Sequence, residues 1–304
     1  MRILKTLKQW GQSDPHGALV RSFWHGTPLR PLHWACLRSF LNANHTFELF
    51  TYGRLEAPKG VHLRDASTVL PEEKMFFFQN PHTGEEDVAP FADYFRLKVL
   101  YEYGGWWCDV DTICLSNELP RGKRIWSRQA PDYRPESVSN GQLFFRRKDR
   151  VARKLLHKCE KSLTDLKRRE QLGPELLSEV LNDLGLPLDM GATAAVFYPI
   201  SYVENFKLWL PEFYDEVLGK IGSAIFLPVY QSFPTHLGFD SSKLPPVGSF
   251  LYSFIRQHAP EFPNVAHEAE EFRTAIRIWL RNNHQARSRL MAVSKEDIVG
   301  WIEG

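Results

Sequence analysis

The chain has 304 residues, which is enough to bury a large core and close to the upper size limit of one domain. With 43% hydrophobic residues, 24% charged residues and a net charge of +2, its composition is that of a globular protein, and it lacks the strong positive field that favours nucleic acid. No apolar run approaches 18 residues, and the N-terminal segment is too short and polar for a signal peptide, so we expect a cytoplasmic protein without a membrane span.

The four cysteines show no CxxC spacing, which argues against structural zinc and fits a reducing compartment. We expect Cys36, Cys108 and Cys114 to be small buried hydrophobic residues, because each lies in an apolar run.

The first half of the chain alternates strand and helix patterns. In chain order we expect a strand at 18–24, a helix at 31–41, strands at 46–52 and 61–63, a helix at 71–79 and a polar loop at 80–88. This order predicts an α/β fold, with a mainly parallel sheet flanked by helices.

The second half reads as mostly helical. We expect strands at 124–128 and 142–146, helices at 151–166 and 174–184, and short apolar runs at 194–198 and 224–229. A long loop at 230–248, which is a candidate lid, precedes helices at 249–258 and 268–283 and a last helix capped by Ser294 and Asp297. No linker divides the chain. We therefore expect one domain over 1–304, with an α/β half at about 18–150 and a helical half, for the acceptor and a lid, at about 151–304.

Residues 89–115 carry the most informative pattern. They predict a helix, a stop at Gly104 and Gly105, and an apolar strand that ends in Asp109-Val110-Asp111. Two carboxylates at positions i and i+2 of a strand point to the same face, and Val110 between them faces the core. Such a pair suits a hard divalent cation, which in turn could hold a diphosphate. The alternative is two aspartates that cap turns at the strand end.

Asp93 and Arg96 share one face of the preceding helix, which is otherwise almost entirely apolar. A charged pair in such a helix must be mutually satisfied or point into a cavity. The spacing fits either a simple ion pair or a site in which Asp93 accepts hydrogen bonds from hydroxyl groups and Arg96 supplies a fixed positive charge.

The run Asp93-x-x-Arg96 followed by 104–111 (GGWWCDVD) resembles the signature of DXD-containing sugar-nucleotide glycosyltransferases with a GT-A fold. It is most similar to the family 32 type, relatives of yeast mannosyltransferases and bacterial polysaccharide transferases, and to the glucosylating domain of large clostridial toxins. Residues 23–26 (FWHG) also resemble these families, and weaker matches lie at 140–141, 173–174 and 197–199.

The resemblance implies a GT-A-like, Rossmann-type sheet and a role for each matching residue. The donor site would comprise Phe23, Trp24, His25, Gly26, Asp93, Arg96, Trp107 and Asp109, with Trp24 stacked on the base and Asp93 and Arg96 on the sugar. Asp93, Arg96, Asp109 and Asp111 would be the catalytic set. Asp109 and Asp111 would bind Mn²⁺ or Mg²⁺.

The sequence departs from this family at a late His-x-Trp, because 224–228 (AIFLP) has Phe and Pro at those positions. His236 is our candidate for the third metal ligand, and Asp240 is a lesser one. Both could equally be ordinary loop residues.

The resemblance implies a retaining hexosyltransferase that uses a nucleoside-diphosphate sugar and a hydroxyl acceptor. We expect a glycan or glycolipid acceptor, as in the biosynthesis of a surface polysaccharide. The alternatives are a non-catalytic nucleotide-sugar binder with a degraded site, a nucleotidyltransferase, and a toxin-like enzyme that modifies a protein. Five arginines at 273, 277, 281, 287 and 289 predict a basic amphipathic helix, which fits either a solvated face or peripheral contact with the inner membrane.

Overall fold

A computed structural model describes residues 17–26, 28–79, 84, 86–129, 137–188, 193–293 and 298–303. Its centre is a six-stranded sheet with the order β3-β2-β1-β6-β9-β8. The strands are β1 (Leu19–Phe23), β2 (Thr46–Thr51), β3 (His62–Asp65), β6 (Gly105–Cys108), β8 (Arg124–Arg128) and β9 (Val138–Phe145). Only β9 runs against the others, so the predicted α/β class with a mainly parallel sheet is confirmed.

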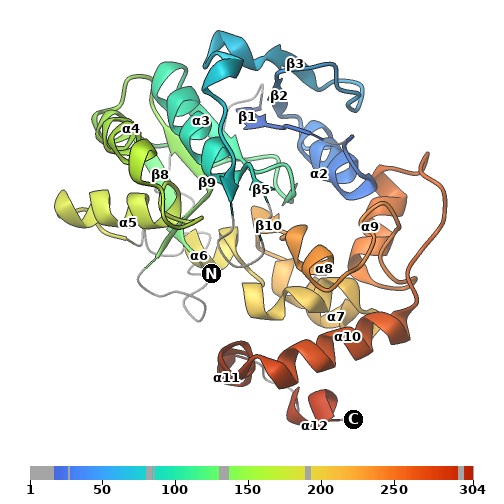
Figure 1. Ribbon diagram of the computed structural model, residues 1–304. Coiled ribbons are helices and arrows are strands. Elements are labelled where there is room, and N and C mark those ends of the chain that lie inside the picture. The colour runs from blue at the N-terminus through green and yellow to red at the C-terminus, as the bar shows by residue number, and fades with distance from the viewer. Residues whose placement is uncertain are drawn as a thin grey trace.

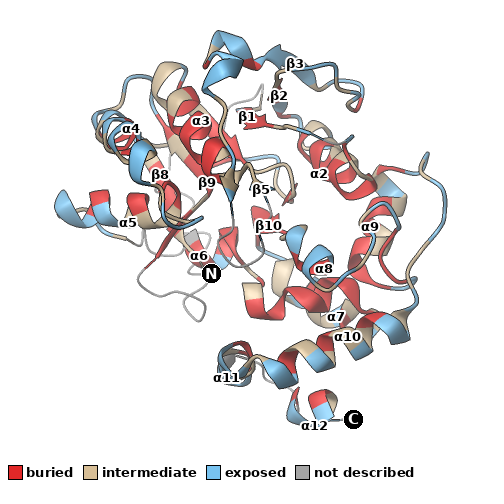
Figure 2. Cartoon of the chain, in the orientation of Figure 1, coloured by how far each residue is buried: buried red, intermediate tan, exposed pale blue. Residues whose placement is uncertain are grey.

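Helices cover both faces of the sheet (Figure 1). One face packs against α2 (Pro31–Asn42), and the other packs against α3 (Ala89–Glu102), α4 (Arg150–Ser162) and α5 (Pro174–Asp183). Trp106 and Trp107 show the alternation of β6, because they are adjacent in sequence but belong to the cores on opposite faces. Figure 2 shows the buried side of α3 turned toward the strands.

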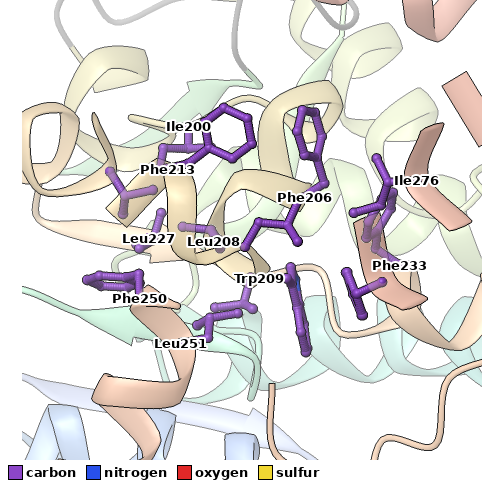
Figure 3. Close-up of a cluster of buried hydrophobic side chains, with 14 of the residues drawn as sticks. Ile200, Phe206, Leu208, Trp209, Phe213, Leu227, Phe233, Phe250, Leu251 and Ile276 are labelled. Carbon is purple, nitrogen blue, oxygen red and sulfur yellow. The ribbon is translucent and has the colours of Figure 1, made fainter. Parts of the chain in front are cut away.

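The C-terminal part is mainly helical. It contains α6 (Thr193–Phe197), α7 (Tyr214–Ile221), α8 (Ser232–His236), α9 (Phe250–His258), α10 (Ala269–Asn282), α11 (His284–Val293) and α12 (Ile298–Glu303). Its core of buried aromatic and aliphatic side chains includes Phe206, Trp209 and Phe250 (Figure 3). The strand β10 (Phe226–Pro228) pairs with β7 (Thr112–Cys114) in a separate two-stranded sheet, and so ties this part to the segment that follows β6.

Several local predictions were wrong. Residues 71–79 form no α-helix: a 3₁₀ turn at Glu72–Lys74 is followed by β4 (Phe78–Gln79), which pairs with β5 (Glu86–Asp87). The predicted loop at 230–248 contains α8, and α11 was missed. The predicted cap at Ser294 and Asp297 lies outside the described residues.

The four cysteines of the chain, and most of the arginines of its C-terminal helices, are engaged inside the protein. All four cysteines are free and buried. Four of the five arginines, at 273, 277, 281 and 287, bond to neighbouring parts of the same helical region. Among the described residues, no helix is both long enough and apolar enough to span a bilayer.

Candidate functional site

The strand order places a cleft between β1 and β6. On one side of this cleft the sheet continues from β1 to β2 and β3. On the other side it continues from β6 to β9 and β8. Ligands of open α/β sheets bind at such a switch point, outside the carboxyl ends of the strands. A cavity of about 560 Å³ lies there, a volume typical of small-molecule sites.

Nine of the ten predicted site residues line this cavity: Phe23, Trp24, His25, Asp93, Arg96, Trp107, Asp109, Asp111 and His236. Gly26 does not line it, and neither does Asp240, whose carboxylate accepts a hydrogen bond from the backbone N–H of Ser242. The structure thus brings the predicted residues together, while their individual roles stay predictions.

The two aspartates of the DxD lie in a turn, not on the strand as predicted. β6 ends at Cys108, and the backbone N–H of Thr112 donates to the carbonyl of Asp109 at 3.0 Å. The strand argument for a shared face was therefore wrong, although both side chains do reach the cavity. Val110, expected in the core, is half-buried and lines the cavity as well. Gly104 and Gly105 have φ values of 69° and 88°, so the predicted left-handed stop before β6 is confirmed.

Arg96 is the structural centre of the site. Its guanidinium is buried above the Trp107 ring, 5.1 Å from the ring centroid. Nη2 donates to Asp109 at 2.7 Å, and Nη1 lies 3.1 Å from Asp93 and donates to the carbonyl of Asn140. One cation therefore holds the two carboxylates in place, which explains how a charged pair persists inside an apolar helix.

Each carboxylate also has a neutral donor. Trp107 Nε1 donates to Asp109 Oδ1 at 2.8 Å, and Asn140 Nδ2 donates to Asp93 Oδ1 at 2.7 Å. For Asp111, the donor is the backbone N–H of Gln231, at 3.0 Å from Oδ2. These bonds fix the orientation of all three side chains before any ligand binds.

The cavity has an excess of negative charge. Burial raises the pKa of Asp93 and of Asp111 to about 6, and the Asp109 carboxylate adds to both increases. The cavity lining has five carboxylates and three guanidinium groups, so an excess of two negative charges remains at neutral pH; these residues are Asp87, Asp93, Asp109, Asp111 and Glu170, and Arg30, Arg96 and Arg169. A divalent cation with carboxylate ligands fits this donor set.

The protein does not supply a complete metal shell by itself. Among the described residues, no group of three or more His, Cys, Asp and Glu side chains is arranged to hold a metal ion. His236, the predicted third ligand, lines the cavity at the end of α8 without forming such a group. A cation at Asp109 and Asp111 would need further oxygens from water or from a bound ligand.

Sequence reasoning missed Gln231. It follows β10, whose antiparallel pairing with β7 brings residues 229–231 beside the DxD turn, and Val229 N–H donates to the carbonyl of Asp111. Gln231 lines the cavity, and its Oε1 is buried without a hydrogen-bond partner in the described part of the chain. The preceding Tyr230 has a φ of 52°, a strained value for this residue type. No local pattern in the sequence shows this, because it depends on long-range pairing.

The opposite end of the cavity is aromatic. The Phe23 ring is buried against Phe91 and Phe95, so only the neighbourhood of its backbone is open to a ligand. Trp24 follows β1 and lies half-buried, with its ring centroid 4.5 Å from that of His33. A half-buried indole beside the sheet edge can stack on a planar ligand.

The chain is thus an α/β protein with an acidic cavity at the switch point of its sheet. Comparison with known proteins relates one segment of it to a family. The family model described as "Glycosyltransferase sugar-binding region containing DXD motif" matches residues 62–130, which include Asp93, Arg96 and the DxD. The predicted resemblance is confirmed over that segment.

Two solved structures are similar in part. The PaToxG glycosyltransferase is 15% identical with a TM-score of 0.42, over 60% of this chain and 74% of that one. The apo-form glycosyltransferase GlyE of Streptococcus pneumoniae TIGR4 is 12% identical, with a TM-score of 0.42. The match covers 88% of this chain and 63% of the GlyE chain. At this similarity neither structure bears on function. No curated protein matches the sequence.

Proposed function

We propose that this protein is a metal-dependent glycosyltransferase that moves a hexose-type sugar from a nucleoside-diphosphate sugar to a hydroxyl acceptor. The observation that carries the proposal is that Asp93, Asp109 and Asp111 line one cavity, with the first two held by Arg96, within a segment that matches a glycosyltransferase sugar-binding region. The trio lines a cavity large enough for a nucleotide sugar.

Different residues of the cavity bind different parts of the donor. Trp24 stacks on the base, Asp109 and Asp111 hold Mn²⁺ or Mg²⁺, and Asp93 accepts hydrogen bonds from sugar hydroxyls. When bound, the cation supplies Lewis-acid stabilisation of the departing diphosphate. Arg96 keeps Asp93 and Asp109 in position, so that little reorganisation is needed during the reaction. In line with the resemblance, we propose retention of configuration at the sugar.

A test is a panel of nucleotide sugars with Mn²⁺, in which released nucleoside diphosphate is measured. We expect turnover with at least one donor, and a loss of roughly 10²–10³-fold in Asp111→Ala, typical for removal of a preorganised electrostatic group. Asp215→Ala, at an exposed position of α7, is the matched control and should retain the wild-type rate. Absence of turnover with every donor, or full activity of Asp111→Ala, would refute the proposal.

For the acceptor, we propose a glycan or glycolipid hydroxyl. We do not extend the proposal to a membrane surface, because four arginines of the basic helices are engaged within the protein. A toxin-like transfer to a protein hydroxyl is compatible with the same donor site. The same panel, supplied with oligosaccharide or protein acceptors, separates the two.

A further inference from the structure

His33 is a buried polar residue of the cavity that the proposed reaction leaves without a role. It lies in the first turn of α2, lines the aromatic end of the cavity and is only 3% exposed. Its Nδ1 accepts the backbone N–H of Arg30 at 3.2 Å, as part of the cap of α2.

This hydrogen bond fixes the tautomer of the ring. A backbone N–H can only donate, so Nδ1 carries no proton and the single proton of the neutral ring is on Nε2. Burial, reinforced by the charge of Arg30, lowers the pKa of His33 to about 3, so the ring stays neutral at physiological pH. In the described part of the chain, no hydrogen bond is made by Nε2.

The His33 ring lies next to the indole of Trp24, which we propose to stack on the base. The His33 and Trp24 rings have centroids 4.5 Å apart and planes inclined by 59°. The two rings are therefore in contact without forming a parallel stack, and both line the same end of the cavity. A planar ligand stacked on Trp24 would lie close to the His33 ring.

We propose that His33 selects the base of the donor nucleotide by donating from Nε2–H to O4 of uracil or O6 of guanine, and thus favours these bases over cytosine and adenine. The inference rests on the proposed function, because it assumes a nucleotide in this cavity. Cytosine and adenine carry an amino group where uracil and guanine carry the oxygen. An amino group facing an N–H would leave a buried donor unpaired, which binding sites of this kind reject.

The test is calorimetric titration of the Mn²⁺-loaded protein with UDP, CDP, GDP and ADP. UDP and CDP, and likewise GDP and ADP, form pairs that differ in this exocyclic group. We expect the oxo member of the better-binding pair to bind about tenfold more tightly, the value of one buried hydrogen bond.

Two variants separate the donor from the helix cap. His33→Asn keeps an acceptor near Nδ1 but has no atom at Nε2, so the preference should fall to within about twofold. His33→Gln places an amide N–H near Nε2 and should retain part of the preference. His157→Asn, at an exposed position of α4, is the control and should bind like the wild type. Thermal unfolding verifies that each variant is folded.

Tighter binding of the amino base by the wild type, or an unchanged preference in folded His33→Asn, would overturn the role of His33 alone. If none of the four nucleotides binds the wild type, the proposed function itself fails, and the inference fails with it.

Discussion

Replacing Asp111 with Asn should stabilise the metal-free protein while removing its response to metal. Burial, and then the Asp109 carboxylate, raise the pKa of Asp111 from 3.8 to about 6. Between these values the folded state holds more protons than the unfolded state, so the free energy of unfolding falls as the pH rises through this range. At neutral pH the ionised Asp111 therefore costs stability.

The size of the effect follows from the pKa. The difference between 3.8 and about 6 corresponds to at most about 3 kcal/mol. The side chain borders the cavity and is only half-buried, so screening by water reduces the expected gain to about 1 kcal/mol. Asn has nearly the same shape, and its amide oxygen can still accept the N–H of Gln231. We expect a rise in melting temperature of roughly 2–4 °C.

The assay is thermal unfolding at pH 7.5, first with EDTA and then with Mn²⁺ and the nucleoside diphosphate that binds best. The wild type should gain about 2.7 kcal/mol at a ligand concentration of a hundred times Kd, and Asp111→Asn should gain little. At pH 4 the difference between the two metal-free proteins should narrow. Asp215→Asn, an exposed replacement in α7, should change neither quantity. The reasoning predicts that the ionised Asp111 carboxylate costs stability without metal and binds the cation. It would be contradicted if the metal-free variant were less stable than the wild type, or if the variant kept the full gain from Mn²⁺.

Three further predictions concern the same cavity. Trp24→Ala should weaken nucleotide binding by roughly tenfold or more in calorimetry, the value of one stacked base, whereas Trp24→Phe should retain most of it. In Gly173→Ala the new Cβ would lie 2.3 Å from Asp93 Oδ2; the displaced carboxylate should lower the transfer rate by about 10²-fold. Gly219→Ala, in open space on α7, should not change the rate. Mn²⁺–nucleotide affinity, titrated against pH, should fall by up to about tenfold per pH unit below 6, because Asp111 must lose its proton to bind the cation; an affinity independent of pH from 5 to 7.5 would contradict this.

Much of the α/β part could be predicted because its signals are local. The strand and helix patterns from 18 to 63 and the turn at Gly104 rest on hydrophobic period and glycine chemistry, which act within a few residues. The grouping of Asp93, Arg96 and the DxD into one site came instead from the resemblance to a glycosyltransferase signature. Local reasoning failed at residues 71–79, where pairing between β4 and β5 overrides a helix-like spacing.

Gln231 and His33 were not predicted from the sequence for the same reason: both reach the site through contacts between separate parts of the fold. Gln231 reaches Asp111 through the pairing of β10 with β7, across more than a hundred positions of sequence. His33 lies in an apolar stretch that predicts a buried helix face, and only the fold, which places it in contact with Trp24, brings it to the cavity. Neither contact can be predicted from the pattern of neighbouring residues in the sequence.

Two glycines outside the matched segment leave room for two carboxylates of the acidic trio. A Cβ at Gly141 would lie 3.1 Å from Asp109 Oδ2, and one at Gly173 would press on Asp93. Arg96 and Trp107 both donate to Oδ1 of Asp109, whereas Oδ2 accepts no hydrogen bond from the described residues. Gly141 therefore leaves space beside the Asp109 carboxylate oxygen that accepts no hydrogen bond within the described ranges. Because β9 and the loop before α5 supply these glycines, the geometry of the site depends on the packing of the whole sheet and not on the DxD turn alone.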